Sequence, residues 1–189
     1  MLNSNLKYAL LAAVAFIGVS SGTAQASYCG DGKTVTFAGI DWESGAFITE
    51  VMKEILAKGY DCKVDSIPGN SVTLEQATAN NDVQIFAEEW IGRSDIWNTA
   101  AAAGQVKSVG KTFVGAAEGW FVPEYLVKGD AEKGIEAKAP DLKSVEQLSD
   151  PKIVELFKDP EEPSKGRFLN CPSGWTCEGV NTAKLEAYK

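Results

Sequence analysis

The sequence predicts an α/β fold built on a parallel sheet. Strand-like apolar alternation at 34–38, 60–67 and 83–90 is interrupted by helix-like apolar spacing at 44–59 and 74–79. Three strand and helix units within about 60 residues favour parallel strands with right-handed crossovers. With 189 residues, 44% hydrophobic and 23% charged, the chain can form one domain or one domain and part of a second.

The first 26 residues have the pattern of a signal peptide. Lys7 precedes the apolar run Tyr8–Val19, and Ala24-Gln25-Ala26 places small residues where a signal peptidase reads, so we expect cleavage after Ala26. Because the apolar run is short for a membrane span, the sequence predicts a soluble protein exported to the periplasm. An uncleaved N-terminal anchor is the alternative.

Start and stop residues predict the bounds of the helices. Ser44 is expected to cap the first helix and Gly59 to end it. Thr73 with Gln76 forms a capping-box pattern for a second helix at 74–79, and a third helix is expected from about 95 to Gly104. Further along, the sequence predicts short β-like pieces at 106–109 and 112–114, a surface excursion at 128–140, short helices at 144–149 and 150–157, and a loop at 159–163.

Tryptophan follows two of the predicted strands. The run 83–90 ends in Glu88-Glu89-Trp90, and the first strand leads through Asp41 to Trp42. Ligands of α/β proteins bind in the crevice at the carboxyl ends of parallel strands, which makes Trp90 and Trp42 candidate binding residues. The alternative is that Trp90 covers a core, where aromatic side chains are common.

A second candidate site lies at 170–178, Asn-Cys-Pro-Ser-Gly-Trp-Thr-Cys-Glu. The helical spacing that follows predicts that 174–177 begins a helix, whose free N–H groups and dipole attract an anion. Trp175 stands on that helix end, so an aromatic wall and a carboxylate site would coincide. Alternatively, Trp175 packs over a disulfide.

Four cysteines in an exported chain predict two disulfides. Cys29 and Cys62 each lie just before or at the start of a strand, and Cys171 and Cys177 bracket a short loop, so we expect the pairs Cys29–Cys62 and Cys171–Cys177. A zinc site is the competing interpretation. It is disfavoured because the chain has no histidine and an oxidising compartment favours disulfides.

The charge and the absence of histidine exclude several functions. The net charge is −8, and without residues 1–26 the chain keeps 17 basic and 26 acidic residues, a net charge of −9. Nucleic acid and anionic membranes are poor partners for such a surface. Without histidine, the Ser-His-Asp, Cys-His and histidine-metal chemistries are ruled out.

At these residues the chain resembles the glycine betaine/proline-type periplasmic substrate-binding proteins of ABC importers. The resemblance covers nearly the whole segment after the signal, through the strand ending in Trp90, Gly119-Trp120-Phe121-Val122-Pro123, the stretch 139–145 and, most specifically, 171–178. It implies a periplasmic-binding-protein-like (type II) two-lobe fold, with a first lobe at 27–122 and the start of an incomplete second lobe at 123–189.

The resemblance also implies a function. The chain would capture glycine betaine, or a related quaternary ammonium or amino-acid-like solute, between the lobes and deliver it to an ABC permease in the inner membrane. It would act as a monomer, without catalysis, cofactor or metal. Trp90 and Trp175 would be walls of a tryptophan box, and the N–H groups of Thr176 and Cys177 would hold the ligand carboxylate.

The sequence departs from the family pattern in two places. The chain stops inside the expected second lobe, so a third box aromatic expected further on is absent. Where glycine betaine binders of this group can place a histidine after the first box tryptophan, this chain has Arg93 and Ser94. Ser94 and Glu89 are therefore additional candidates for ligand contact, and the ligand stays open.

Two other classes of protein compete for the same residues. An exported carbohydrate-active or carbohydrate-binding protein would also use tryptophans and a carboxylate pair. It is disfavoured because adjacent residues of a strand, such as Glu88 and Glu89, point to opposite faces. A thiol-disulfide protein is disfavoured because Cys171 and Cys177 lack the Cys-x-x-Cys spacing of redox motifs.

Overall fold

The structure is a computed structural model that describes residues 29–30 and 32–188. The predicted signal segment and its cleavage site after Ala26 lie outside the described residues. In the described part of the chain, no helix is long and apolar enough to cross a membrane.

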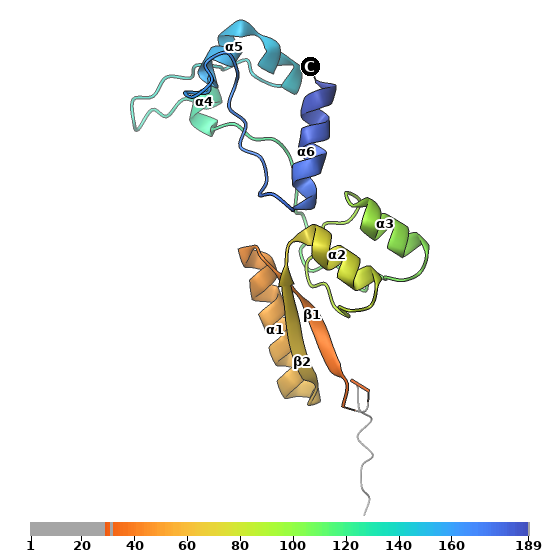
Figure 1. Ribbon diagram of the computed structural model, residues 1–189. Helices are drawn as coiled ribbons and strands as arrows, with labels where there is room; N and C mark the ends of the chain where they lie inside the picture. Colours follow the sequence, from red (N-terminus) through yellow and green to blue (C-terminus); the bar gives the residue numbers. More distant parts are fainter. Residues whose placement is uncertain (1–28, 31, 189) are drawn as a thin grey trace, which may run out of the picture.

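The chain begins with a parallel β-α-β unit, as the sequence predicts (Figure 1). Strand β1 (Thr34–Ile40) pairs in parallel with β2 (Lys63–Gly69), from Thr34 opposite Lys63 to Ile40 opposite Gly69. Helix α1 (Glu43–Tyr60) connects the two strands and runs along the sheet. Because β2 has one paired neighbour among the described residues, Pro68 can lie within this strand without breaking a ladder.

The segment 83–90 joins this sheet only partly, so the prediction of a full third strand is wrong. It forms one parallel bridge, Phe37 with Ile85, next to β1. The amide of Thr36 donates to the side chain of Gln84 (2.9 Å), while the amides of both Gln84 and Ile85 donate to the Thr36 carbonyl. A side chain thus replaces a backbone acceptor, and the ladder ends after one bridge.

Two helix starts also differ from the prediction. Trp42 is the N-cap of α1, while Ser44 lies in the first turn and donates its hydroxyl to Glu88. Helix α2 (Ser71–Ala79) begins earlier than predicted because Asn70 caps it and accepts the Thr73 amide. Asparagine is a strong N-cap, so it outcompetes the capping box expected from Thr73.

The other helix ends follow their local signals more closely. Helix α1 continues one residue past Gly59, because Asp61 adopts the left-handed conformation that ends it. Helix α3 (Asp95–Ala102) begins near residue 95 as predicted, with Ser94 as its cap, and ends two residues before Gly104.

A group of short helices follows, at 124–188, which we call the helical group (Figure 1). A short helix is present where one was expected at 144–149, and Ser144 and Gln147 form a capping box at its start. The prediction of β-like pieces at 106–109 and 112–114 is wrong, because neither stretch pairs with a strand among the described residues. The elements of this group are α4 (Glu124–Lys128), the 3-10 helix η1 (Val145–Ser149), α5 (Pro151–Leu156) and α6 (Thr176–Ala187).

The core lies between β1 and α2 and is small. Ala38, Ile40, Leu74 and Val83 are buried together, with Trp42, Ala77 and Phe86 packed against them. Both expected disulfides are present. Cys29–Cys62 joins the segment before β1 to the residue before β2, and Cys171–Cys177 joins the loop before α6 to its first turn, with Cα separations of 5.6 Å and 6.0 Å.

Candidate functional site

A cavity of about 650 Å³ lies between the N-terminal β-α-β unit and the helical group. Its volume is in the range of about 300–1,000 Å³ that small-molecule sites occupy. The predicted ligand-binding residues that line it are Trp42, Glu89, Trp90, Trp175, Thr176 and Cys177.

Trp42 and Trp175 form one corner of this cavity. Trp42 lies two residues after β1 as the N-cap of α1, and its indole lies against Gly45, where an added Cβ would be 2.8 Å from the Trp42 Nε1. The absence of a side chain at Gly45 therefore makes room for the indole. Trp175 meets Trp42 edge to face, with ring centroids 5.3 Å apart and an interplanar angle of 62°.

Trp90 lies on another wall, fixed by two charged neighbours. Its Nε1 donates to Glu88 Oε1 at 3.0 Å. The guanidinium carbon of Arg93 lies 5.2 Å from the ring centroid of Trp90, and Arg93 is itself held by Glu118 at 2.5 Å. The Arg93 side chain thus orients the indole and occupies part of its face.

Helix α6 begins where the chain returns to α2. The amide of Thr176 donates to the Ser71 hydroxyl at 2.8 Å, and the Thr176 hydroxyl donates to Glu75 Oε1 at 2.8 Å. Gly174, with φ of +85°, lies against Asn70. The Thr176 amide, expected to hold a ligand carboxylate, is therefore bonded to the protein itself.

Ser94 is the predicted site residue that does not line the cavity. Its buried hydroxyl accepts the Trp97 amide at 3.2 Å and so caps α3. The same hydroxyl donates to Glu75 Oε2 in a short contact. Ser94 therefore holds Glu75, which does line the cavity.

Glu89 is the cavity residue with the largest electrostatic perturbation. Burial raises the pKa of its carboxyl, and the nearby Glu75 carboxylate raises it further, whereas Arg93 lowers it. The resulting pKa is about 8, so this side chain carries its proton at neutral pH.

Glu88 and Glu89 both line this cavity, and their side chains have different neighbours. Glu88 accepts from Ser44 of α1, whereas Glu89 lies near Glu75 of α2. The regular ladder ends at Ile85, and the chain bends before Trp90.

Several cavity residues were not predicted. Glu75 is buried on α2, four residues after Ser71 and three before Thr78, both of which are also buried. This helical spacing places Glu75 on the core side of α2, a signal that could have identified it.

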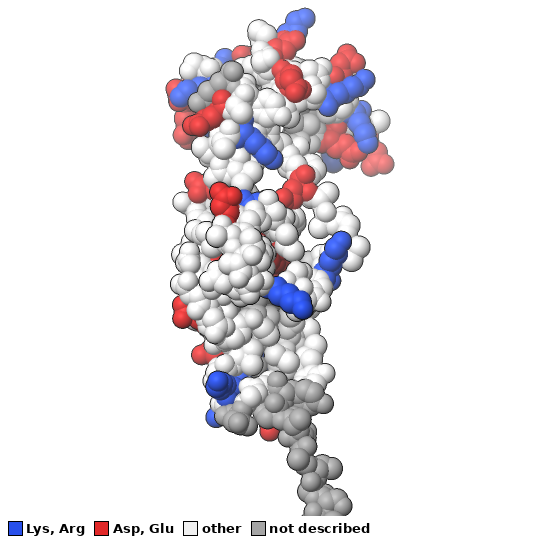
Figure 2. Space-filling view, turned by 90° about the vertical axis from the view of Figure 1, so that its right-hand side faces the viewer, with Lys and Arg blue, Asp and Glu red and all other residues white. Residues whose placement is uncertain are grey.

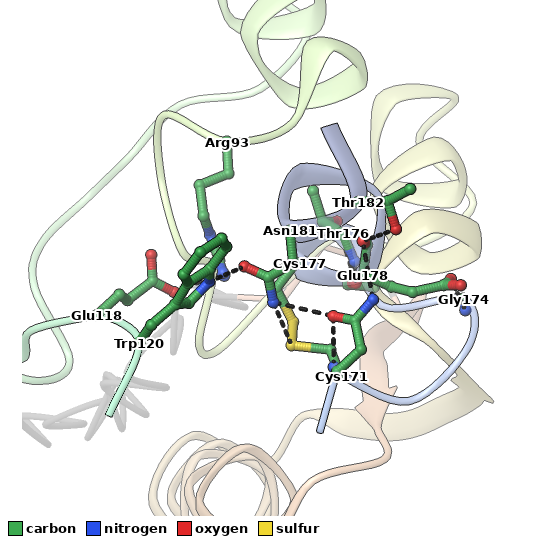
Figure 3. The surroundings of a disulfide bond; sticks show 12 residues. Arg93, Glu118, Trp120, Cys171, Gly174, Thr176, Cys177, Glu178, Asn181 and Thr182 are labelled. Carbon is green, nitrogen blue, oxygen red and sulfur yellow. Dashed lines mark hydrogen bonds and ion pairs between the residues drawn. A yellow bond between two sulfur atoms is a disulfide. The ribbon is translucent and has the colours of Figure 1, made fainter. Parts of the chain in front are cut away.

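Trp120 is a further wall residue, and Figure 3 shows its indole pointing toward Asn181. Its Nε1 donates to Asn181 Oδ1 at 2.9 Å, next to the Cys171–Cys177 disulfide. Phe168 and Tyr188 pack on the same ring, with centroids 5.0 Å and 6.0 Å away. The aromatic pair at 120–121 was visible in the sequence, but its place at the cavity depends on long-range contacts.

Among the described residues, no group of three or more acidic or cysteine side chains is placed to hold a metal ion. The family comparison is more informative. Residues 33–189 match the model of the substrate-binding domain of ABC-type glycine betaine transport systems. The chain belongs to this family. No curated protein and no solved structure matches it.

Family membership agrees with the resemblance seen in the sequence. It implies a periplasmic-binding-protein-like fold, consistent with the mixed α/β architecture observed here. It also identifies the chain as a substrate-binding component for glycine betaine-like solutes in an ABC-type system, a class of proteins that bind without catalysis.

Proposed function

We propose that this protein is the extracytoplasmic solute-binding component of an ABC importer. It captures glycine betaine, or a related quaternary ammonium or amino-acid-like solute, in the cavity between the N-terminal unit and the helical group. It then delivers the solute to a permease in the inner membrane. In this proposal the protein is periplasmic and monomeric, and its acidic surface has no role in binding nucleic acid.

The observation that carries the proposal is the convergence of Trp42, Trp90 and Trp175 on one cavity. Aromatic faces attract a quaternary ammonium, which offers no hydrogen-bond donor, and each desolvated contact contributes roughly 1–2 kcal/mol. The carboxyl groups of Glu75 and Glu88, which are 2% and 6% exposed, add negative potential beside these rings.

Capture of a carboxylate-bearing solute would use the start of α6. The Cys177 amide lies in the first turn of this helix, at the positive end of its dipole. The Cys171–Cys177 disulfide fixes this turn, which lowers the entropy that binding has to overcome.

One observation favours a second candidate, the carbohydrate-active or carbohydrate-binding protein. Glu88 and Glu89 share a cavity lined by tryptophans, and the pKa of Glu89 is raised, as in a general acid. Family membership supports the solute-binding function instead. Release of reducing sugar from oligosaccharides would favour the second candidate.

The proposal is tested by titrating the purified protein with glycine betaine while following tryptophan fluorescence and thermal unfolding. We expect a saturable fluorescence change and a higher unfolding temperature, with the solute recovered unchanged, because the ligand contacts tryptophan and binds only the folded state. Sucrose and glycine, at the same concentrations, are the controls. Absence of a response to every quaternary ammonium tested would contradict the proposal.

A further inference from the structure

Glu75 is a buried residue whose carboxyl group contacts the beginnings of two other helices. It belongs to α2 and is 2% exposed. Its Oε2 accepts a short hydrogen bond from the hydroxyl of Ser94, the N-cap of α3. Its Oε1 accepts the hydroxyl of Thr176, the first residue of α6, at 2.8 Å. One side chain thus joins α2, α3 and α6.

The two helix beginnings compensate for the burial of this carboxylate. Among the described residues, no Lys or Arg forms an ion pair with Glu75. The N-terminal end of a helix carries a partial positive charge, and its first N–H groups have no partner within the helix. Hydroxyl donors and two helix dipoles therefore stabilise a carboxylate that is otherwise costly to bury. Its charge favours an arrangement in which α3 and α6 both meet α2 at this point.

Helix α6 contacts α2 through its first turn. Across 176–187, which the structure describes in full, no residue is buried. The amide of Thr176 donates to the Ser71 hydroxyl at 2.8 Å, and the amide of Val72 donates to the Gly174 carbonyl at 3.5 Å. Because α6 adds no buried side chain to the core, we expect these hydrogen bonds and the one to Glu75 to set where the helix begins.

The position of Trp175 follows from that of Thr176. Trp175 is the N-cap of α6 and directly precedes Thr176, and the disulfide between Cys171 and Cys177 closes the turn that contains both. This turn is therefore held as one unit. The Trp175 ring meets Trp42 with centroids 5.3 Å apart, so the contacts of the turn with α2 determine where one aromatic wall of the cavity stands.

From these observations we infer that Glu75 is a positioning residue for solute binding. Its carboxylate holds the beginnings of α3 and α6 and, through Thr176, keeps Trp175 against Trp42. Both of its oxygens accept from hydroxyls of the protein, so Glu75 acts on the solute through α6. The inference rests on the proposed solute-binding function and adds a residue to its site. A binding arrangement that is populated less often gives a lower apparent affinity, which makes this role measurable.

Two substitutions at Thr176 separate the hydroxyl from the shape of the side chain. Thr176→Val keeps the shape and removes the hydroxyl, whereas Thr176→Ser keeps the hydroxyl. In calorimetric titration with glycine betaine, we expect Thr176→Val to bind about three- to tenfold more weakly, because a hydrogen bond to a charged group is lost, and Thr176→Ser to stay within about twofold. Thr182→Val, at an exposed site of the same helix outside the cavity, is the control and should bind like the unaltered protein.

The variant Glu75→Met assigns the effect to Glu75, because it keeps the length of the side chain and removes the carboxylate. If the Thr176 hydroxyl acts through Glu75, adding Thr176→Val to Glu75→Met should weaken binding no further. If the hydroxyl contacts the solute directly, the two losses should multiply, and that result would overturn the inference.

Circular dichroism of the ligand-free protein provides a readout that does not depend on the solute. Two indoles 5.3 Å apart couple their electronic transitions and give a paired signal in the far ultraviolet, which Trp42→Phe identifies by removing it. Thr176→Val and Glu75→Met should reduce this signal while unfolding stays cooperative, and Thr176→Ser should keep it. If a single variant does not fold, the double variant, which leaves no buried carboxylate without its donor, is measured in its place.

The outcomes separate the inference from the proposed function. An unchanged indole signal and an unchanged affinity in the folded variants overturn the inference and leave the solute-binding function standing. A reduced indole signal, with no binding of any quaternary ammonium by the unaltered protein, supports the placement of Trp175 by Glu75 and overturns the proposed function.

Discussion

Glu89 is the residue whose protonation should set the pH dependence of stability. Its folded pKa of about 8 lies above the ordinary glutamate value of 4.5, so the folded state keeps a proton that the unfolded state has already released. Stability therefore falls as the pH rises from about 4.5 to about 8, and the full penalty remains above that range.

Glu89→Gln should remove this dependence. Glutamine cannot ionise, so we expect the variant to gain on the order of 2 kcal/mol over the unaltered protein at pH 8.5 and little at pH 4.5. Urea unfolding at the two pH values measures the difference, and Glu186→Gln, at an exposed site on α6, is the control. Equal gains at both pH values would show that the Glu89 proton is not the cause.

Local caps explain which elements could be predicted from the sequence. The box of Ser144 and Gln147 acts over three residues and starts the short helix expected there. Ser94 caps the helix that was expected from about residue 95. Asn70 acts over the same range and replaces the cap expected from Thr73, whereas Trp42 takes the N-cap position expected for Ser44 without a side-chain hydrogen bond. The partial strand at 83–90 depends on the Gln84 side chain, which a pattern of apolar residues does not reveal.

The contact between α6 and α2 can be tested at Gly174. A Cβ at this position would lie 2.5 Å from Asn70 Nδ2, and the φ of +85° strains any other residue. We expect Gly174→Ala to destabilise the protein by about 1–2 kcal/mol and to weaken ligand binding, because the start of α6 moves away from Ser71.

Gly179→Ala is the matched control on the same helix. An added Cβ at Gly179 meets nothing within 4 Å, and alanine favours a helix interior over glycine by about 0.5–1 kcal/mol. Denaturant unfolding of the two variants should therefore give changes of opposite sign. Similar stability for Gly174→Ala and the unaltered protein would contradict the described contact.

At the scale of the whole molecule, the helical group and the N-terminal unit differ in how many charged residues their surfaces carry. On the face shown in Figure 2, Lys, Arg, Asp and Glu gather over the helical group, whereas the surface below it is largely uncharged. Helix α1 adds an exposed apolar row, with Phe47 at 70% and Ile55 at 54% exposure. The four-residue spacing of this row predicted the helix but not its exposed face.

Phe47→Gln with Ile55→Gln tests this exposed row. Because both side chains are already in contact with water, the double variant should unfold within about 0.5 kcal/mol per site of the unaltered protein. Binding of a hydrophobic dye should decrease, because apolar surface is removed. A loss of several kcal/mol would mean that the row is covered in solution.

The site is formed by contacts across the whole molecule, and only part of it could be predicted from the sequence. Trp90 and Trp175 were predicted from local patterns, the apolar alternation before Trp90 and the helical spacing after Trp175. Their meeting at one cavity depends on contacts such as Ser71 with Thr176, which are 105 residues apart in the chain. Such pairs leave no periodic signal, which is also why the role of Trp120 was not predicted.

The central claim is that tryptophan faces hold an ammonium solute in this cavity, and calorimetric titration of Trp175→Ala tests it most directly. We predict that Trp175→Ala weakens the binding of the best quaternary ammonium ligand by about tenfold or more, that Trp175→Phe retains part of the affinity, and that both variants stay folded. An unchanged dissociation constant for folded Trp175→Ala would contradict the account.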